Sequence, residues 1–302
     1  MLDKLKTAFK LLKQAGKDWM DDGAMTLASS VAYYTVFSMA PLLIIAIAIA
    51  GAIFGEEAAR GEIVEQIQSL VGEQGAQFIQ TAIENADKPE ISSWASVISV
   101  IVLLIGASGV FIQLQNALNI VWDVTVKPDA GIMNFIRKRL LSFSAVLGIG
   151  FLLLVSLLAS ALLSGMSKYM SSLLPGADWI WLLVNNLVSF GFITLMFALM
   201  FRYLPDVNIK WSDVWIGALI TTALFILGKH LLGLYLGQSS FGSTYGAAGS
   251  LVIFLAWVYY SAQILFFGAE FTQAYAREYG GKIVPNDHAM RLSEYKTKPT
   301  SS

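Results

Sequence analysis

Runs of about 20 consecutive, mostly apolar residues are the feature that most limits what this chain can fold into. An α-helix of that length crosses a hydrocarbon core of about 30 Å. Backbone polar groups in lipid must bond within their own segment, so each run predicts a helix. We expect six transmembrane helices, at Leu27–Phe54, Trp94–Val121, Leu140–Gly165, Trp179–Phe201, Val214–Leu236 and Gly249–Phe271.

The composition agrees with an integral membrane protein of the all-α class. Charged residues make up 14% of the 302 residues, against about 25% in soluble domains. The chain has no cysteine, which excludes disulfides, thiolate metal sites and cysteine nucleophiles.

The positions of Lys and Arg predict the orientation. With both termini in the cytoplasm, the inner segments carry 16 of the 20 Lys and Arg residues, whereas the outer segments carry Arg60, Lys88 and Lys168. Cytoplasmic loops are enriched in these residues. We therefore expect both termini to be cytoplasmic, with Lys229 inside the fifth span.

The remaining segments divide into three parts around the transmembrane domain, residues 23–272. Residues 1–22 place leucines and lysines at helical spacing and predict a basic amphipathic helix, either on the inner leaflet or solvated beside the bundle. Residues 55–93 form an acidic outer loop, which we expect to be a helical hairpin over the outer mouth, broken at "VGEQG". Residues 273–302 read as a polar cytoplasmic tail.

The first span carries polar residues that crossing a membrane does not require. At about 100° per residue, Ser30, Tyr33, Tyr34 and Ser38 lie on one stripe of the helix, together with Pro41. These side chains either hydrogen-bond neighbouring helices, as small polar residues do in membrane bundles, or line a polar pathway.

The second and fifth spans also carry polar side chains. Gln113 and Asn116 lie deeper than Asn119 and Asp123, which we expect to emerge into cytoplasmic water. Lys229 lies about 24 Å along its helix from the inner end. An intramembrane Lys marks a functional site by default, although its side chain could instead extend to the outer headgroups.

The sixth span carries Tyr260, Gln263 and Glu270 on one helical face. Glu270 lies near the inner end, where we expect an ion pair with Arg202 or with the basic cluster Arg137, Lys138 and Arg139. Those three cations also predict a site for anionic lipid headgroups, each charge contributing about 1 kcal/mol. Their other role is to orient the third span.

Four ordered motifs carry a family resemblance: "LASSVAYYTVFSMAPLL", "LQNALNIVWDV", "RYLPDVNIKWSDVWIGAL" and "YGAAGSLVIFLAWVYYSAQILFFGAEFTQAYA". Together they resemble the YihY/virulence factor BrkB family of bacterial inner-membrane proteins, over about Asp18 to Gly280. The resemblance implies a multi-pass protein of the cytoplasmic (inner) membrane and makes transport or export of envelope lipids a candidate activity.

Members of this family were once labelled ribonuclease BN, and the residues argue against that activity. Metal-dependent hydrolysis needs clustered His and Asp ligands, but the two histidines, His230 and His288, have no ligand spacing between them. The chain also lacks an aromatic and basic platform for nucleic acid. We expect no enzyme activity, no cofactor, no metal and no nucleic-acid partner.

The polar stripes on four spans favour a transporter or lipid-translocating protein for an anionic envelope lipid or amphiphile, working through a groove between helices. The alternative is a membrane scaffold or envelope-organising protein that needs polar residues only for helix packing. Membrane lipids are the expected partners. A protein partner in the envelope and the oligomeric state stay open.

Overall fold

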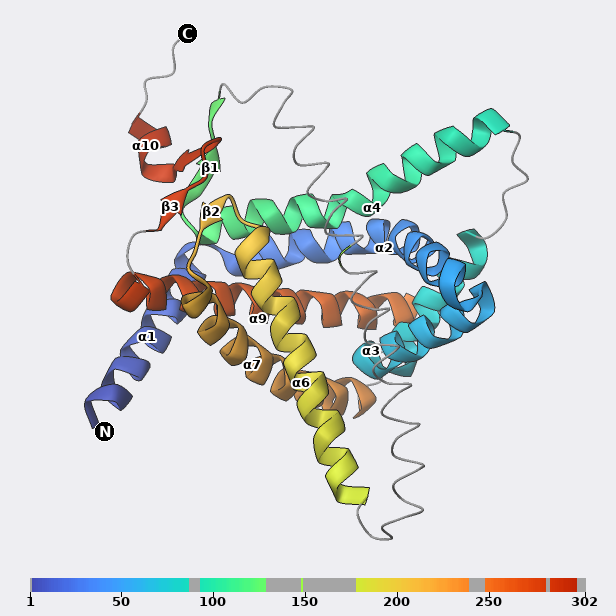
Figure 1. The fold of residues 1–302 in the computed structure, drawn as a ribbon, viewed down its shortest axis with the longest axis horizontal. Coiled ribbons are helices and arrows are strands. Elements are labelled where there is room, and N and C mark those ends of the chain that lie inside the picture. Colours follow the sequence, from blue (N-terminus) through green and yellow to red (C-terminus); the bar gives the residue numbers. More distant parts are fainter. Residues whose placement is uncertain are drawn as a thin grey trace.

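The computed structural model describes residues 2–86, 93–128, 148, 178–238, 248–280 and 283–297, and these are mostly helical (Figure 1). The helices are α1 (Leu2–Asp21), α2 (Ala24–Phe54), α3 (Glu56–Ala86), α4 (Ser93–Val121), α6 (Asp178–Tyr203), α7 (Trp211–Gln238), α9 (Gly249–Tyr275), the π-helix η3 (Ala276–Gly280) and α10 (Leu292–Thr297). The strands are β1 (Val124–Val126), β2 (Val207–Asn208), β3 (Val284–Pro285) and β4 (Ala289–Arg291).

Five of these helices, α2, α4, α6, α7 and α9, are long and apolar enough to cross a membrane. They coincide with five of the six expected spans and confirm the membrane class. The third expected span, Leu140–Gly165, lies outside the described residues except for position 148, and Arg137, Lys138 and Arg139 lie outside them too.

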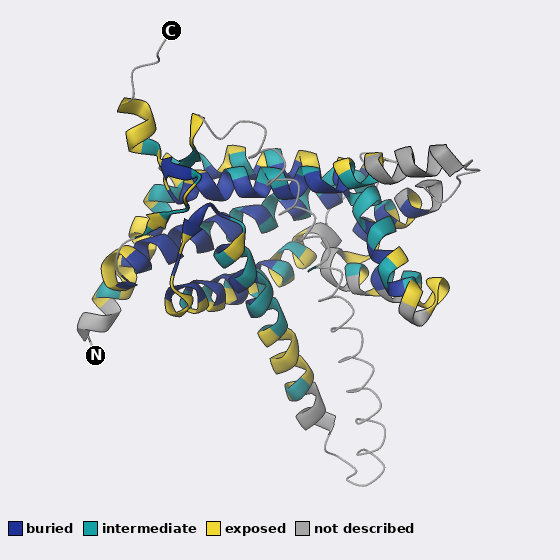
Figure 2. Ribbon diagram, turned by 45° about the horizontal axis from the view of Figure 1, so that its top comes forward, coloured by how far each residue is buried: buried dark blue, intermediate teal, exposed yellow. Residues whose placement is uncertain are grey.

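Helix α9 is the central element of the described bundle, because it packs against α1, α2, α3, α4 and α7. Figure 2 shows buried positions running along α2, α4 and α9. Glycines let α7 and α9 approach closely: a Cβ added at Gly217 would lie 1.7 Å from the Thr272 hydroxyl oxygen. The reciprocal contact joins Gly268 and Thr221, at 1.9 Å. Small residues commonly allow such approach between membrane helices.

The expected helical outer loop is α3, which consists of two helical stretches that meet at Gly72. Gly72 has φ 80°, a left-handed conformation that glycine adopts without a Cβ penalty. The break falls within the predicted "VGEQG" segment. Ile63 and Ile83, one on each side of it, are buried in a cluster with residues of α2 and α9.

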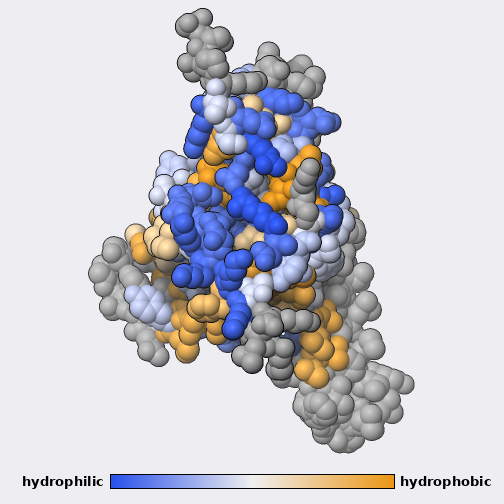
Figure 3. Space-filling model, turned by 90° about the vertical axis from the view of Figure 1, so that its left-hand side faces the viewer, coloured by the Kyte–Doolittle hydropathy of each residue, from blue (hydrophilic) through white to orange (hydrophobic). Residues whose placement is uncertain are grey.

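The C-terminal segment folds back onto the bundle instead of extending as a tail. Strand β4 pairs antiparallel with β1, directly after α4, and β3 pairs antiparallel with β2, in the link between α6 and α7. We call this end of the molecule, which carries all four strands, the sheet end. Figure 3 shows that hydrophilic residues cover much of its face, and it is the end that the Lys and Arg bias assigns to the cytoplasm.

Helix α1 is docked against α9 at the sheet end. Leu11 and Ala15 are buried against Phe271 and Ala274, and the Trp19 indole nitrogen donates a hydrogen bond to a main-chain carbonyl of α9, that of Gln263, at 3.2 Å. The opposite face exposes apolar Phe9 and Met20 among its lysines. One face of α1 therefore joins the bundle, while the other keeps the amphipathic character that the sequence predicts.

Candidate functional site

Glu270 is a carboxyl group buried inside the described bundle. It lies in the last turns of α9 and is 0% exposed. Neither of its carboxylate oxygens accepts a hydrogen bond from an amide, hydroxyl or basic group among the described residues. A buried, ionised carboxylate without a donor is costly, so this position needs an explanation beyond packing.

Three further acidic residues surround Glu270. Asp22 lies within hydrogen-bonding contact of it, and Asp18 and Asp123 act on it electrostatically. Asp18 accepts a 2.8 Å hydrogen bond from Gln14 through Oδ1, whereas its buried Oδ2 has no partner in the described part of the chain. We call Asp18, Asp22, Asp123 and Glu270 the carboxyl cluster.

The turn between α1 and α2 brings Asp22 to Glu270. Gly23 takes a left-handed conformation with φ 65°, which ends α1 and redirects the chain into α2. Asp22 keeps its N–H bonded to the Asp18 carbonyl at 2.8 Å, so its side chain lies beside the last turn of α1. The turn between α1 and α2 thus places the Asp22 carboxyl group beside α9.

Burial raises the pKa of the Asp22 carboxyl above its ordinary value. The neighbouring carboxylates of Asp123, Asp18 and Asp21 raise this pKa further, while the hydrogen bond with Glu270 lowers it. Both burial and like charges disfavour the ionised form. The surroundings of Asp22 therefore favour a protonated carboxyl group.

The expected ion pair between Glu270 and Arg202 is not found. Arg202 instead donates to the main-chain carbonyl of Ile209, in the link between α6 and α7. The arginine nearest the cluster, Arg277, pairs with Asp123, whose side chain is 57% exposed. This guanidinium neutralises the outermost carboxylate and leaves Glu270 without a counter-ion among the described residues.

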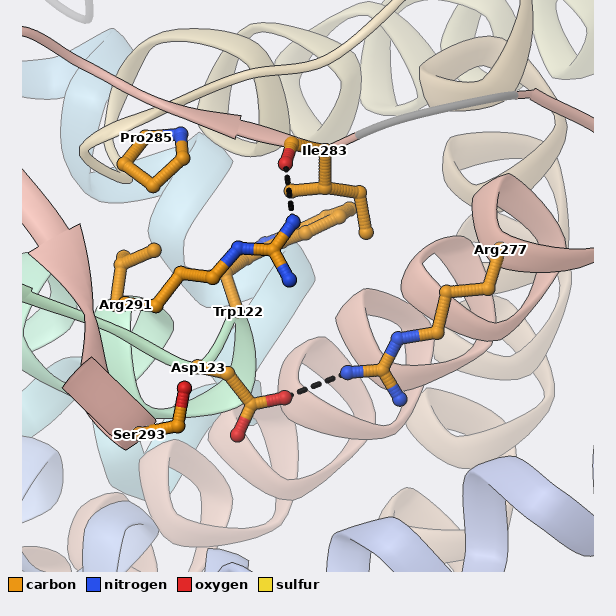
Figure 4. Close-up of a pocket in the computed structure, with 8 residues that line it drawn as sticks. Trp122, Asp123, Arg277, Ile283, Pro285, Arg291 and Ser293 are labelled. Atoms are coloured by element: carbon orange, nitrogen blue, oxygen red, sulfur yellow. Dashed lines mark hydrogen bonds and ion pairs between the residues drawn. The ribbon is translucent and has the colours of Figure 1, made fainter. Parts of the chain in front are cut away.

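A pocket of about 570 Å³ opens beside the cluster at the sheet end (Figure 4). Asp123 and Arg277 form their ion pair at its wall, and Arg291 donates to the Ile283 carbonyl at 3.3 Å. Trp122 also lines it, and the buried indole nitrogen of this residue has no hydrogen-bond partner in the described ranges. The pocket connects the solvent side of the sheet end to the exposed edge of the carboxyl cluster.

Asp206, in contrast, is a buried carboxylate with every oxygen satisfied. Its Oδ1 accepts from Gln115 Nε2 at 3.2 Å and from His288 Nε2 at 2.8 Å, and its Oδ2 accepts from Asn119 Nδ2 at 2.8 Å. Its own N–H donates to the Asn119 side-chain oxygen at 2.8 Å. We call this set the Asp206 network. It ties α4, the α6–α7 link and the C-terminal segment together.

The Asp206 network corrects one expectation from the sequence. Asn119 does not emerge into water but is 5% exposed, and two hydrogen bonds join it to Asp206 in the link after α6. Asp123, four residues later, is exposed as expected.

The polar stripe on α2 divides into two kinds of position. Ser38 is buried between α2 and α4: it donates to the Gly106 carbonyl at 2.7 Å and accepts from the Val110 N–H at 3.2 Å. Tyr33 and Tyr34 are 60% and 44% exposed, and their rings meet edge to face. Ser30 is half-buried. Ser38 thus has a packing role, whereas the tyrosines present phenols at the surface of the described bundle.

The other pathway candidates are half-buried: Gln113, Asn116, Lys229, Tyr260 and Gln263. Tyr260 packs on α7 at Gly228, where an added Cβ would lie 2.5 Å from the Tyr260 ring. Tyr260 therefore packs against Gly228, the residue that directly precedes Lys229 in the chain. The candidates therefore gather in separate places: the α2–α4 contact, the α7–α9 contact and the carboxyl cluster. Two pockets at the sheet end are lined by other residues.

Several residues of this site were missed from the sequence. Asp18 and Asp22 lie at the polar end of the predicted amphipathic helix, on either side of the sequence Trp-Met-Asp. Gln115 lies between Gln113 and Asn116 in the chain but was not among the predicted site residues. The usable signal was "DDG" directly before an apolar run, since a glycine turn can redirect a neighbouring acid toward the bundle.

Comparison with known proteins places the chain in a family. Residues 15–293 match the family described as Virulence factor BrkB. A UPF0761 membrane protein of Methylibium petroleiphilum is 30% identical over 96% of this chain. Relatives in Rhodospirillum centenum and Acinetobacter baylyi, also named UPF0761 membrane proteins, are 28% and 25% identical over 93% and 95%. No solved structure matches the chain.

The chain spans 67%, 60% and 67% of the lengths of these three relatives. The family match covers both the carboxyl cluster and the Asp206 network, since all their residues lie within 15–293. The five apolar helices, the family match and the relatives agree with one another, and the chain belongs to the virulence factor BrkB family of multi-pass proteins of the bacterial inner membrane.

Proposed function

We propose that the protein is a transporter that moves an anionic envelope lipid or amphiphile along a polar groove between its helices. The observation that carries this proposal is Glu270, a fully buried carboxyl group with no donor partner among the described residues, in the helix that contacts most of the others. Ionisable residues inside membrane helices commonly mark ion and substrate pathways or proton relays.

Glu270 separates this proposal from the scaffold alternative. A scaffold needs only polar groups that pack helices, and Ser38, Thr222 and Thr272 act in that way, with every hydroxyl bonded. A buried carboxyl group without a donor lowers stability and adds nothing to helix packing. Retaining one suits a protein whose working cycle uses the charge.

The class of substrate rests on Lys229 and the α2 tyrosines. Lys229 is half-buried within α7 and has no acidic partner in the described ranges, so it is available to a negative headgroup. Tyr33 and Tyr34 expose their side chains within the apolar helix α2, where hydrocarbon would offer their hydroxyl groups no partner. A substrate with an anionic polar head and apolar chains would satisfy both features.

The test is lipid translocation by the purified protein in liposomes of phosphatidylethanolamine and phosphatidylglycerol. We expect labelled phosphatidylglycerol to cross faster than labelled phosphatidylethanolamine, because Lys229 favours the anionic head. Glu270→Gln should abolish the protein-dependent movement, whereas Lys229→Met should remove the preference between the two lipids.

Glu278→Gln is the matched control, since Glu278 lies eight residues further along the same end and pairs with Lys10 in an exposed bridge. It should transport as the wild type does. A wild-type protein that moves neither lipid nor a soluble anionic amphiphile, yet stabilises another envelope protein, would favour the scaffold. Lys229→Met with unchanged preference would remove Lys229 from the mechanism.

A further inference from the structure

We infer that Glu270 and Asp22 form a proton-binding site in which the two carboxyl groups share one proton. The transport proposal leaves the driving ion unnamed, and this site deepens it by naming that ion. The proton site can nevertheless be measured without any substrate.

The contact between the two side chains requires a proton. Two ionised carboxylates are acceptors only, and neither can donate to the other. Asp22 lies within hydrogen-bonding contact of Glu270, and the Glu270 oxygens receive no other donor among the described residues. One proton turns this repulsive contact into a charge-assisted hydrogen bond, which is the strong kind.

The surrounding charges act in the same direction. Asp18 and Asp21 approach from α1, and Asp123 approaches from the end of α4; all three are acidic. Arg277 of η3 is paired with Asp123, and Gln273 donates to Asp123 Oδ2 and to the Val121 carbonyl rather than to Glu270. The raised pKa of Asp22 follows from the same geometry.

A proton fits this site better than a metal ion does. Within the described residues, no group of three or more His, Asp or Glu side chains is arranged to hold a metal. Small cations such as Mg²⁺ or Ca²⁺ need six or more oxygen ligands, whereas a proton needs two. The pocket beside Asp123 gives the cluster a polar connection to the solvent at the sheet end.

Losing the shared proton has a mechanical consequence at this point of the fold. Two negative charges would then face one another across the contact between α9 and the turn that joins α1 to α2. That contact is otherwise held by Leu11, Ala15 and the Trp19 hydrogen bond. Proton release therefore acts directly on the packing of the first span against the central helix.

The test is an infrared pH titration of the full chain in lipid nanodiscs. We expect the wild type to show the carbonyl band of a protonated carboxylic acid at neutral pH, shifted in D₂O and lost on alkaline titration. Glu270→Gln should lose this band. Asp22→Asn should keep it at a shifted frequency, because the proton then stays on Glu270 beside a neutral amide.

Asp21→Asn is the matched control, because Asp21 adjoins Asp22 but is exposed and exerts the smallest of the charge effects on it, and this variant should keep the band. A correctly folded wild type without the band at neutral pH would overturn the site, as would the same band in Glu270→Gln. Loss of the band on adding sodium at constant pH would overturn it too, in favour of a metal cation. A band without lipid movement would leave the proton site standing and refute the transport proposal.

Discussion

Asp206 and Glu270 are both buried carboxylates near the sheet end, and they are surrounded in opposite ways. Asp206 is 2% exposed and accepts hydrogen bonds from two amides and a histidine. Glu270 is 0% exposed, has no amide or basic donor among the described residues, and the charged groups that act on it there are acids. The ionised form of the same chemical group is therefore satisfied at one place and unsatisfied at the other.

This difference shows what separates a structural acid from a functional one. Burial alone does not distinguish them, because both carboxylates are equally removed from solvent. What separates them is whether the neighbours supply donors to the ionised form. A network with every group satisfied rigidifies a core, whereas an unsatisfied group is a cost that persists only for another reason.

Asp206→Ala should destabilise the protein most. It leaves the donors of Gln115 and Asn119 buried without this acceptor and removes the acceptor of His288, and we expect the free energy of unfolding to fall by about 3 kcal/mol or more. Chemical unfolding in detergent measures this change. The control is Asp287→Ala at the exposed neighbouring tail position, which should stay within about 0.5 kcal/mol. An equal effect at both positions would show that the network contributes nothing special.

The matched amide substitutions should give effects of opposite sign. Asp206→Asn places an NH₂ group against at least one existing donor, so we expect a loss of about 1–3 kcal/mol in the free energy of unfolding. Glu270→Gln replaces the shared proton with an NH₂ group that donates to Asp22 and removes a carboxylate among other acids, so stability should stay unchanged or rise. Unfolding of both variants under one set of conditions makes the comparison. Equal losses would mean that Glu270 has a stabilising partner.

Much of the fold follows from the sequence because hydropathy and length act locally. The positions of α2, α4, α6, α7 and α9 needed only apolar runs near the length of a membrane core. The break in α3 needed only a glycine-rich segment. Each of these features depends on residues that are adjacent along the chain.

The site follows less well, because it depends on contacts between distant segments. Asn119 reads as a residue leaving the membrane, but two hydrogen bonds join it to Asp206, 87 residues later in the chain. Arg202 was expected to pair with Glu270, but its guanidinium donates to the Ile209 carbonyl in the α6–α7 link. Glu270 itself was identified from its type and depth, but its acidic neighbours were not, since helical phasing says nothing about which helix lies opposite.

Stability should decrease as the pH rises, because of Asp22. Its folded-state pKa is raised, so the folded protein binds more protons than the unfolded chain above the ordinary Asp pKa of about 4. The stabilising contribution of this proton is complete below that pH and is lost as the pH rises through the raised folded-state pKa. Thermal unfolding across this range measures the slope.

Asp22→Asn should flatten the slope, whereas Asp21→Asn should keep most of it, because Asp21 exerts the smallest of the charge effects on Asp22. The two variants separate the half-buried carboxyl group from its exposed neighbour, one residue away. A slope that survives Asp22→Asn would assign the proton uptake to another group and remove Asp22 from the cluster.

The smallest contrast lies within α2, where the separation between satisfied and unsatisfied polar groups recurs along one stripe. Ser38→Ala removes a hydroxyl that bridges the Gly106 carbonyl and the Val110 N–H of α4, so we expect a loss of about 1 kcal/mol in the free energy of unfolding. Tyr33→Phe removes an exposed hydroxyl and should stay within about 0.5 kcal/mol. If the Tyr33 hydroxyl contacts substrate, Tyr33→Phe should instead slow lipid movement, which Ser38→Ala leaves intact. A Tyr33→Phe variant that loses stability but transports normally would make its phenol a packing group like Ser38, and the exposed half of the stripe would no longer support a pathway.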